Sequence, residues 1–204
     1  MSNVNEIEKQ LTQKQASGIE ARKKWGKEVN IDNMPTTESF NEQCGNVFSY
    51  AATIEYDNSA KRQTVIRALP IDSKSWKKER EVIYLLEKDG YVVKIGGTRK
   101  GMADRCSSYN CGHHVPERGK SGRMSVTNAH LYHSIEKDMI EKNGVWKIYI
   151  WNLPSVQISV NILGDETKIN AQTYHAYESK CIEKFKNMCG TLPILCDNSD
   201  PKYR

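Results

Sequence analysis

The run EVIYLLEKDGYVVKIGGT at residues 81–98 constrains the fold of this chain more than any other feature. Two segments rich in β-branched and aromatic residues flank the turn sequence EKDG, and Asp-Gly is a strong signal for a tight hairpin turn. The pattern therefore predicts a β-hairpin over residues 82–98.

The remaining patterns predict an α+β fold, with a small mixed or antiparallel β-sheet flanked by helices. After the hairpin we expect a short helix at 102–109 and a glycine-rich basic loop at 110–127. A helix should then run from an Asn128 cap to Asn143-Gly144, with Leu131, Ile135 and Ile140 on its apolar side. Strands at 145–151 and 156–163 should follow, and then a helix at about 170–188 ended by Gly190 and Pro193. Residues 1–30 are polar with scattered apolar positions and are expected to form a helical arm. We expect residues 1–60 to be this arm and its connection, and residues 61–204 to be the domain that carries the chemistry.

Composition excludes several classes of protein. The chain is 38% hydrophobic and 27% charged, with a mean hydropathy of −0.69. Its longest apolar run, Val82–Leu86, is far too short to cross a bilayer, and the N-terminus has no apolar segment typical of a secretory signal. The six cysteines are sparse and irregularly spaced, which indicates reduced thiols rather than a disulfide scaffold. A cytoplasmic protein without a membrane segment is expected.

Positive charge is concentrated in the middle of the chain. The formal net charge is +5, and residues 94–123 contain seven basic residues against two acidic ones. Such an excess favours a polyanionic partner. The residues expected to reach phosphates or base edges are His113, His114, Arg118, Lys120 and Arg123.

The last expected helix contains a break in its apolar stripe. The stripe consists of Tyr174, Tyr177, Cys181, Ile182 and Phe185, and the i+4 position belongs to Glu178. Burial of an unpaired carboxylate costs several kcal/mol, so Glu178 is expected to pair with a cation, bind a metal or lie in a cleft. An alternative is that it lies at the edge of the stripe and reaches water.

The hairpin turn decides whether Tyr84 and Lys94 can act together. A two-residue Asp89-Gly90 loop places them on opposite faces, whereas a three-residue Lys88-Asp89-Gly90 loop pairs them directly. An ammonium group beside a phenol favours the phenolate, which can act as a base. On the next expected helix, Arg105 and Tyr109 share one face, and an Arg can hold a phosphate bidentately.

The combination of VIY at 82–84, KIG at 94–96, Arg105 with Tyr109, and Glu178 resembles the GIY-YIG nuclease superfamily over about residues 80–198. Val82 stands where the first motif has Gly, and Lys94 stands where the second has Tyr. A branch of the superfamily that includes type II restriction enzymes also has Lys at the second place, so the chain is most similar to that branch.

The resemblance implies a role for each matching residue. Tyr84 would be the general base or orient the attacking water, and Lys94 would hold it near phenolate. Arg105 would bind the scissile phosphate, with Tyr109 touching that phosphate or the water. Glu178 would hold a divalent metal, with Mg²⁺ expected. Asn187 and Asn198 are alternatives for a further site residue that many members of the family have.

The implied function is site-specific hydrolysis of phosphodiester bonds in double-stranded DNA by a type II restriction endonuclease. A homodimer is the simplest assembly for cutting both strands, residues 1–60 would clamp DNA or form the dimer, and a cognate DNA methyltransferase is expected. The alternatives are a phage, mobile-element or repair endonuclease of lower specificity, and an inactive DNA-binding module.

Two other metal-site patterns compete weakly with this interpretation. Glu166-x-Lys168 matches part of another nuclease signature but lacks the preceding Pro-Asp partner. Cys106, Cys111, His113 and His114 include zinc-ligand types, yet they are crowded into one segment without a second pair.

Overall fold

The computed structural model describes residues 20, 22–56, 66–110 and 126–196. The chain divides into two compact units, which are described separately. The smaller unit contains Met1–Glu28, Tyr56–Arg67 and Ser108–Gly144, and the larger contains Val29–Glu55, Ala68–Ser107 and Val145–Arg204.

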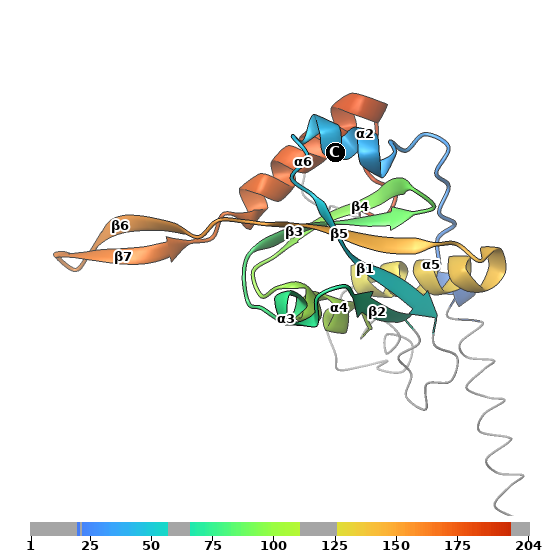
Figure 1. The fold of residues 1–204 in the computed structure, drawn as a ribbon, viewed down its shortest axis with the longest axis horizontal. Helices are drawn as coiled ribbons and strands as arrows, with labels where there is room; N and C mark the ends of the chain where they lie inside the picture. The colour runs from blue at the N-terminus through green and yellow to red at the C-terminus, as the bar shows by residue number, and fades with distance from the viewer. Residues whose placement is uncertain (1–19, 21, 57–65, 111–125, 197–204) are drawn as a thin grey trace, which may run out of the picture. The chain divides into compact units, whose positions relative to one another are not determined.

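The main element of the larger unit is a five-stranded sheet with strand order β2-β1-β5-β3-β4 (Figure 1). Its strands are β1 (Ser49–Tyr56), β2 (Ile66–Pro70), β3 (Val82–Lys88), β4 (Tyr91–Thr98) and β5 (Trp146–Asn152). The β1–β5, β5–β3 and β3–β4 pairs are antiparallel. Every residue of β3 is buried, as expected for an apolar strand with neighbours on both sides. With its helices, this sheet confirms the expected α+β class.

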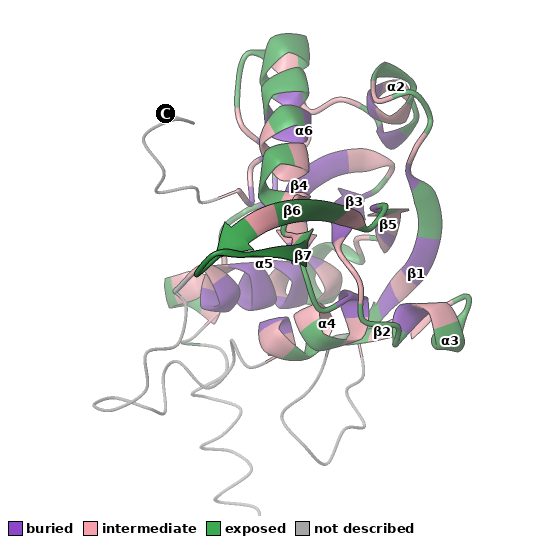
Figure 2. Cartoon of the chain, turned by 90° about the vertical axis from the view of Figure 1, so that its left-hand side faces the viewer, coloured by how far each residue is buried: buried purple, intermediate pink, exposed green. Residues whose placement is uncertain are grey.

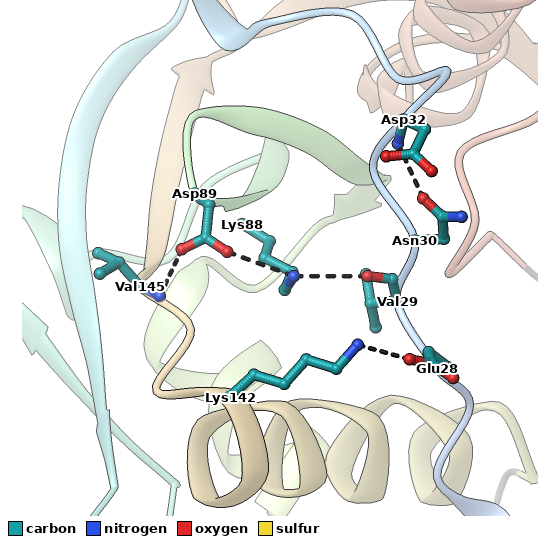
Figure 3. A network of polar contacts seen from close by, with 8 residues as sticks. All are labelled: Glu28, Val29, Asn30, Asp32, Lys88, Asp89, Lys142 and Val145. Carbon is teal, nitrogen blue, oxygen red and sulfur yellow. Dashed lines mark hydrogen bonds and ion pairs between the residues drawn. The ribbon is translucent and has the colours of Figure 1, made fainter.

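The predicted hairpin is confirmed as β3 and β4, joined by the two-residue turn Asp89-Gly90. Both turn residues have positive φ, +50° and +90°, which Asp-Gly adopts readily. Figure 3 shows how the turn is fixed: Asp89 Oδ1 accepts a hydrogen bond from Val145 N at 2.8 Å, and its other oxygen lies 3.3 Å from Lys88 Nζ. Lys88 also donates to Val29 O at 3.4 Å. These contacts hold the turn against the residue before β5 and against Val29.

Helices α6 (Tyr174–Cys189) and α2 (Thr37–Gln43) pack on the same side of this sheet (Figure 1). The predicted α6 stripe is confirmed, since Cys181, Ile182 and Phe185 are buried in the core. Gly190 ends α6 with φ +74°, as predicted. The core cluster that contains Cys181, Ile182 and Phe185 also includes Phe40, Phe48, Ile83, Leu85, Val92 and Ile95.

Two strands lie outside the main sheet. β6 (Val156–Ile162) was predicted, but β7 (Asp165–Ala171) was not, and the two form a separate antiparallel hairpin. The expectation that the last helix starts near Asn170 was wrong, because Asn170 pairs with Gln157 and α6 begins only at Tyr174. The polar segment Asp165–Lys168 conceals the strand alternation in the sequence.

Two short helices complete the larger unit: α3 (Ser73–Trp76) and α4 (Met102–Asn110). The second confirms the predicted helix at 102–109. Its last three residues belong to the smaller unit.

The principal helix of the smaller unit is α5 (Val126–Lys142). Leu131 and Ile135 are buried, whereas Ile140 is 39% exposed. The expectation that Asn128 caps this helix was wrong: α5 starts two residues earlier, and the Asn128 side-chain amide donates to the Ser108 carbonyl and hydroxyl oxygens. Near the other end, Lys142 forms an ion pair with Glu28 (Figure 3).

The expected boundary after residue 60 does not coincide with the observed division. Val29–Glu55 lie in the same compact unit as β3, β4 and α6, and they supply α2 and most of β1. The basic loop predicted at 110–127 lies outside the described residues except at its ends. Among the described residues, no helix has the length and apolar character needed to span a membrane.

Candidate active site

Gly96 and Gly97 on β4 allow two side chains to approach the strand closely. A Cβ atom at Gly96 would overlap the Tyr84 hydroxyl, and one at Gly97 would lie 2.6 Å from Tyr174 Cδ2 and 3.0 Å from Glu178 Oε2. Because successive residues of a strand point to opposite faces, Tyr84 and Glu178 approach β4 from opposite sides. β4 is the edge strand of the sheet, so these two groups lie on opposite faces of the same sheet edge. Arg105, the partner of Tyr84, is near enough to Glu178 to influence the pKa of its carboxyl group.

Tyr84 is paired with a guanidinium group. It lies directly opposite Gly96, and its side chain is fully buried. Arg105 Nε donates a hydrogen bond to the Tyr84 hydroxyl at 3.1 Å. A guanidinium donor stabilises negative charge that develops on the oxygen it contacts, so this contact suits a phenol that takes part in proton transfer.

Glu178 lies half-buried on the side of α6 that faces β4. Burial raises the pKa of its carboxyl group, although nearby Lys94, His175 and Arg105 and a hydrogen bond from the Gly97 N–H act in the opposite direction. The predicted break in the stripe therefore corresponds to a carboxylate that lies against the edge strand, near the basic side chains of Lys94 and Arg105.

Neither predicted arrangement of Tyr84 and Lys94 is found. The loop has two residues, but a bulge between Leu86 and Glu87 on one strand and Lys94 and Val92 on the other shifts the register. Lys94 therefore lies opposite Leu86 rather than Tyr84, and both side chains belong to the same face of the sheet. Lys94 Nζ donates to Leu195 O at 3.1 Å, so the cation that the structure places on the phenol is Arg105.

The other predicted site residues are not among the groups that lie against Gly96 and Gly97. Tyr109 is one turn after Arg105 on α4 and is 8% exposed, but it belongs to the smaller unit. Asn187 is exposed and, nine residues after Glu178, lies on the opposite side of α6. The following predicted residues lie outside the described part of the chain: His113, His114, Arg118, Lys120, Arg123 and Asn198.

Two features that position the site were not predicted from the sequence. Glu81 accepts hydrogen bonds from the Thr173 N–H at 3.1 and 3.0 Å and from the Thr173 hydroxyl at 2.8 Å, which fixes the start of α6. No local pattern predicts a contact between residues so distant in the chain. Gly97 did carry a signal, because glycine inside a strand marks close approach by another group.

The site can hold a metal ion through one carboxylate. Among the described residues, no group of three or more His, Cys, Asp or Glu side chains gathers for a metal. Glu178 supplies the hard oxygen ligand that Mg²⁺ prefers, and Mg²⁺ commonly keeps water and substrate phosphate oxygens as its other ligands. The residues present thus fit a metal that is completed by substrate.

The two competing metal patterns find no support in the described residues. Glu166 and Lys168 are exposed on the separate hairpin. Burial raises the pKa of the Cys106 thiol to about 12, which opposes the thiolate form that zinc binds.

Comparison with known proteins gave matches among solved structures alone. No protein-family model matches the chain, and no curated protein does. The structure described as "Restriction endonuclease HPY188I in complex with product DNA" is similar with a TM-score of 0.54 and 22% identity, over 85% of this chain and 93% of that one. A mutant of bacteriophage T4 EndoII gives a TM-score of 0.48 and 20% identity, over 72% of this chain and 95% of that one. The chain therefore shares the fold of the HPY188I restriction endonuclease.

Proposed function

We propose that this protein is a site-specific DNA endonuclease of the type II restriction class that uses a divalent metal ion, expected to be Mg²⁺. The observation that carries the proposal is that the Tyr84–Arg105 pair and Glu178 lie against the neighbouring residues Gly96 and Gly97 of the edge strand, with Arg105 near enough to influence the pKa of the Glu178 carboxyl group. A base, a phosphate-binding cation and a metal-binding carboxylate can together catalyse hydrolysis of a phosphodiester.

In the proposed reaction, Tyr84 accepts a proton from the water that attacks phosphorus. The Nε–H of Arg105 stabilises the phenolate, and other N–H groups of the same guanidinium contact the scissile phosphate. Lys94 adds positive charge from the same sheet face as Tyr84. Because Tyr84 is fully buried, DNA binding must move Arg105 or its surroundings enough to admit the water.

Glu178 is the proposed metal ligand. When bound, the metal would supply positive charge to the phosphate and the leaving 3′ oxygen. The Gly97 N–H orients the Glu178 carboxylate, so β4 would position both the base and the ligand. Tyr109 is proposed to contact the phosphate or the water.

DNA as the substrate is supported by the fold and by charge. The similar restriction endonuclease was solved with product DNA. The net charge of +5 and the basic residues between 94 and 123 suit a polyanion. We further propose that His113, His114, Arg118, Lys120 and Arg123 contact DNA, that the protein cuts as a homodimer, and that a cognate methyltransferase protects the host DNA. Residues 1–60 would clamp DNA or form the dimer.

The test is incubation of the purified protein with a defined plasmid and a phage genome, in Mg²⁺ or EDTA, beside Glu178→Ala. Discrete fragments that need Mg²⁺ and disappear with the variant would support site-specific cleavage, and sequencing of their ends would give the target. A smear or nicked circles would favour a phage or repair endonuclease. Intact DNA that is still bound in a gel-shift assay would favour a binding module.

A further inference from the structure

Helices α2 and α6 of the larger unit contact each other along one face of α6. Each helix has both buried and exposed residues, as expected for a helix that packs on a core with one side (Figure 2). The rings of Phe40 and Phe185 have centroids 5.7 Å apart, and Lys184 Nζ donates a hydrogen bond to Gln43 O at 2.9 Å. Residues three and four apart share a helix face, so Cys181 faces α2 together with Lys184 and Phe185.

A pair of thiols completes this contact between the helices. Cys44 is the C-cap residue of α2 and is half-buried, whereas Cys181 is buried on α6. Their side chains form a hydrogen bond, in which the Cys181 thiol donates to the Cys44 sulfur. Both residues are free cysteines. Because their sulfur atoms already touch, a small movement would bring them to the distance of about 2 Å that a disulfide bond requires.

The surroundings of the two thiols make them chemically different. The hydrogen bond from Cys181 and the positive charge of Lys184 lower the pKa of the Cys44 thiol, against the effect of burial. The same hydrogen bond, together with burial, raises the pKa of the Cys181 thiol. The dipole at the C-terminal end of α2 alone would oppose a thiolate, and Lys184 supplies the compensating positive charge at Gln43 O. Cys44 is therefore suited to react first, as a thiolate, and Cys181 to react second.

The other cysteines among the described residues lack this combination. Burial raises the pKa of the Cys106 and Cys196 thiols. The Cys189 thiol, two turns after Cys181 on α6, donates to Phe185 O at 3.2 Å. Because thiol reactivity follows thiolate character and exposure, a mild oxidant should react first at Cys44.

We infer that Cys44 and Cys181 form an oxidation site at which a hydroperoxide produces a disulfide bond between α2 and α6. In the first step, the Cys44 thiolate attacks a peroxide oxygen, the O–O bond breaks, hydroxide leaves, and Cys44 becomes a sulfenic acid. In the second step, Cys181 loses its proton and its sulfur attacks the Cys44 sulfur, so that the S–S bond forms, the S–O bond breaks and water leaves. In total the two thiols lose two electrons and two protons, and hydrogen peroxide is reduced to two molecules of water. Excess small thiol reverses the bond by exchange.

The bond would link two helices that are distant in the sequence. A cross-link of this kind restricts the unfolded chain, so the oxidised protein should melt at a higher temperature than the reduced protein. The inference rests on the thiol pair and its neighbours, and it does not depend on the proposed nuclease activity.

The test is peptide mapping of the folded full chain by mass spectrometry without reduction, after treatment with hydrogen peroxide. We expect a linked Cys44–Cys181 peptide, the loss of two titratable thiols per chain, and recovery of both with dithiothreitol. Cys189→Ser, a matched control on the same helix, should form the same link. Cys181→Ser cannot form it, so its Cys44 should remain a sulfenic acid that dimedone traps.

The rate of the reaction tests the role of Lys184. Lys184→Gln removes a positive charge near Cys44, so the pH profile of Cys44 oxidation should shift to higher pH. Lys186→Gln, at an exposed lysine of the same helix, should leave the profile unchanged.

The wild-type protein alone can overturn the inference, so the result does not depend on whether a variant folds. Peroxide-treated wild type in which Cys44 stops at sulfenic acid, or in which other cysteine pairs form at the same rate, would overturn it. Oxidation of Cys181 at the wild-type rate in Cys44→Ser would also overturn it, because Cys44 would then not be the thiol that reacts first.

Discussion

At the scale of the single residue, ionisation of Glu178 should lower the stability of the folded protein, and this can be measured without any activity. Its raised pKa means that the folded protein binds the proton more tightly than the unfolded chain does. Stability should therefore fall as pH rises from the ordinary value near 4.5 through the raised pKa. Glu178→Gln cannot ionise, so we expect it to melt higher than the wild type at neutral pH and to lose that advantage near about pH 4. Calorimetry at both values tests this; a lower melting temperature of the variant at neutral pH would contradict it.

Metal binding should depend on the same ionisation. A protonated carboxyl group is a poor ligand, so the Mg²⁺ concentration for half-maximal cleavage should rise as pH falls through the raised pKa of Glu178. A series of Mg²⁺ titrations between about pH 5 and 8, bracketing carboxyl ionisation, measures this. A requirement that stays constant over the range would contradict the role of Glu178 as metal ligand.

The Tyr84 hydroxyl should matter for the rate rather than for DNA binding. Tyr84→Phe removes the group to which Arg105 donates, and loss of a general base typically costs about 10²–10⁴-fold in rate. Single-turnover cleavage should fall by that order, with DNA affinity unchanged. Tyr91→Phe, in the adjoining strand, is the matched control and should retain activity. Equal rates for the two variants would exclude Tyr84 as the base.

Gly97 should tolerate no larger residue. In Gly97→Ala the new methyl group would lie 2.6 Å from Tyr174 Cδ2 and 3.0 Å from Glu178 Oε2, so α6 or both side chains must shift. Overpacking of this kind costs about 1–3 kcal/mol, and displacement of the carboxylate should also raise the Mg²⁺ concentration for half-maximal cleavage. Denaturant unfolding and Mg²⁺ titration check the two effects. If Gly97→Ala has wild-type stability and a wild-type Mg²⁺ concentration for half-maximal cleavage, Tyr174 and Glu178 do not pack closely against Gly97.

At the level of the elements, Glu81 should position α6. Its carboxylate accepts hydrogen bonds from Thr173 immediately before the helix, and hydrogen bonds to charged groups contribute about 1.5–3 kcal/mol each when well formed. Glu81→Gln should lower stability and raise the Mg²⁺ concentration for half-maximal cleavage, because Glu178 is held by the same helix. Glu79→Gln, an exposed carboxylate two residues earlier, should change neither quantity. If Glu81→Gln lowers stability but leaves the Mg²⁺ concentration for half-maximal cleavage unchanged, Glu81 has a structural role only.

The elements that the sequence predicts well are those with complete local signals. Asp89-Gly90 predicts the β3–β4 turn, and the stripe from Tyr174 to Phe185 predicts α6 and its exceptional Glu178. The bulge beside Val92 has no such signal, so the pairing of Tyr84 with Gly96 could not be foreseen. β7 was missed because its first four residues are polar, and an exposed hairpin does not need apolar residues there.

At the scale of the whole molecule, the site depends on residues that the chain brings together from distant positions. Arg105 follows the hairpin closely, but Glu178 reaches Gly97 only after β5, the β6–β7 hairpin and the first turn of α6. Sequence patterns identified Tyr84, Arg105 and Glu178 as candidates. They could not predict that Arg105, rather than Lys94, contacts the phenol, because that contact depends on tertiary packing.

The single-turnover cleavage rate of Glu178→Gln, compared with Glu183→Gln, tests the proposed metal-dependent site most directly. Both residues lie on α6, but Glu183 is exposed and paired with Lys180. We predict that Glu178→Gln lowers the rate at saturating DNA and Mg²⁺ by about 10³-fold or more, as expected when metal stabilisation worth several kcal/mol is lost, while it still folds and binds DNA. Glu183→Gln should cut at the wild-type rate. Comparable rates for the two variants would contradict the assignment of Glu178 and, with it, the proposed mechanism.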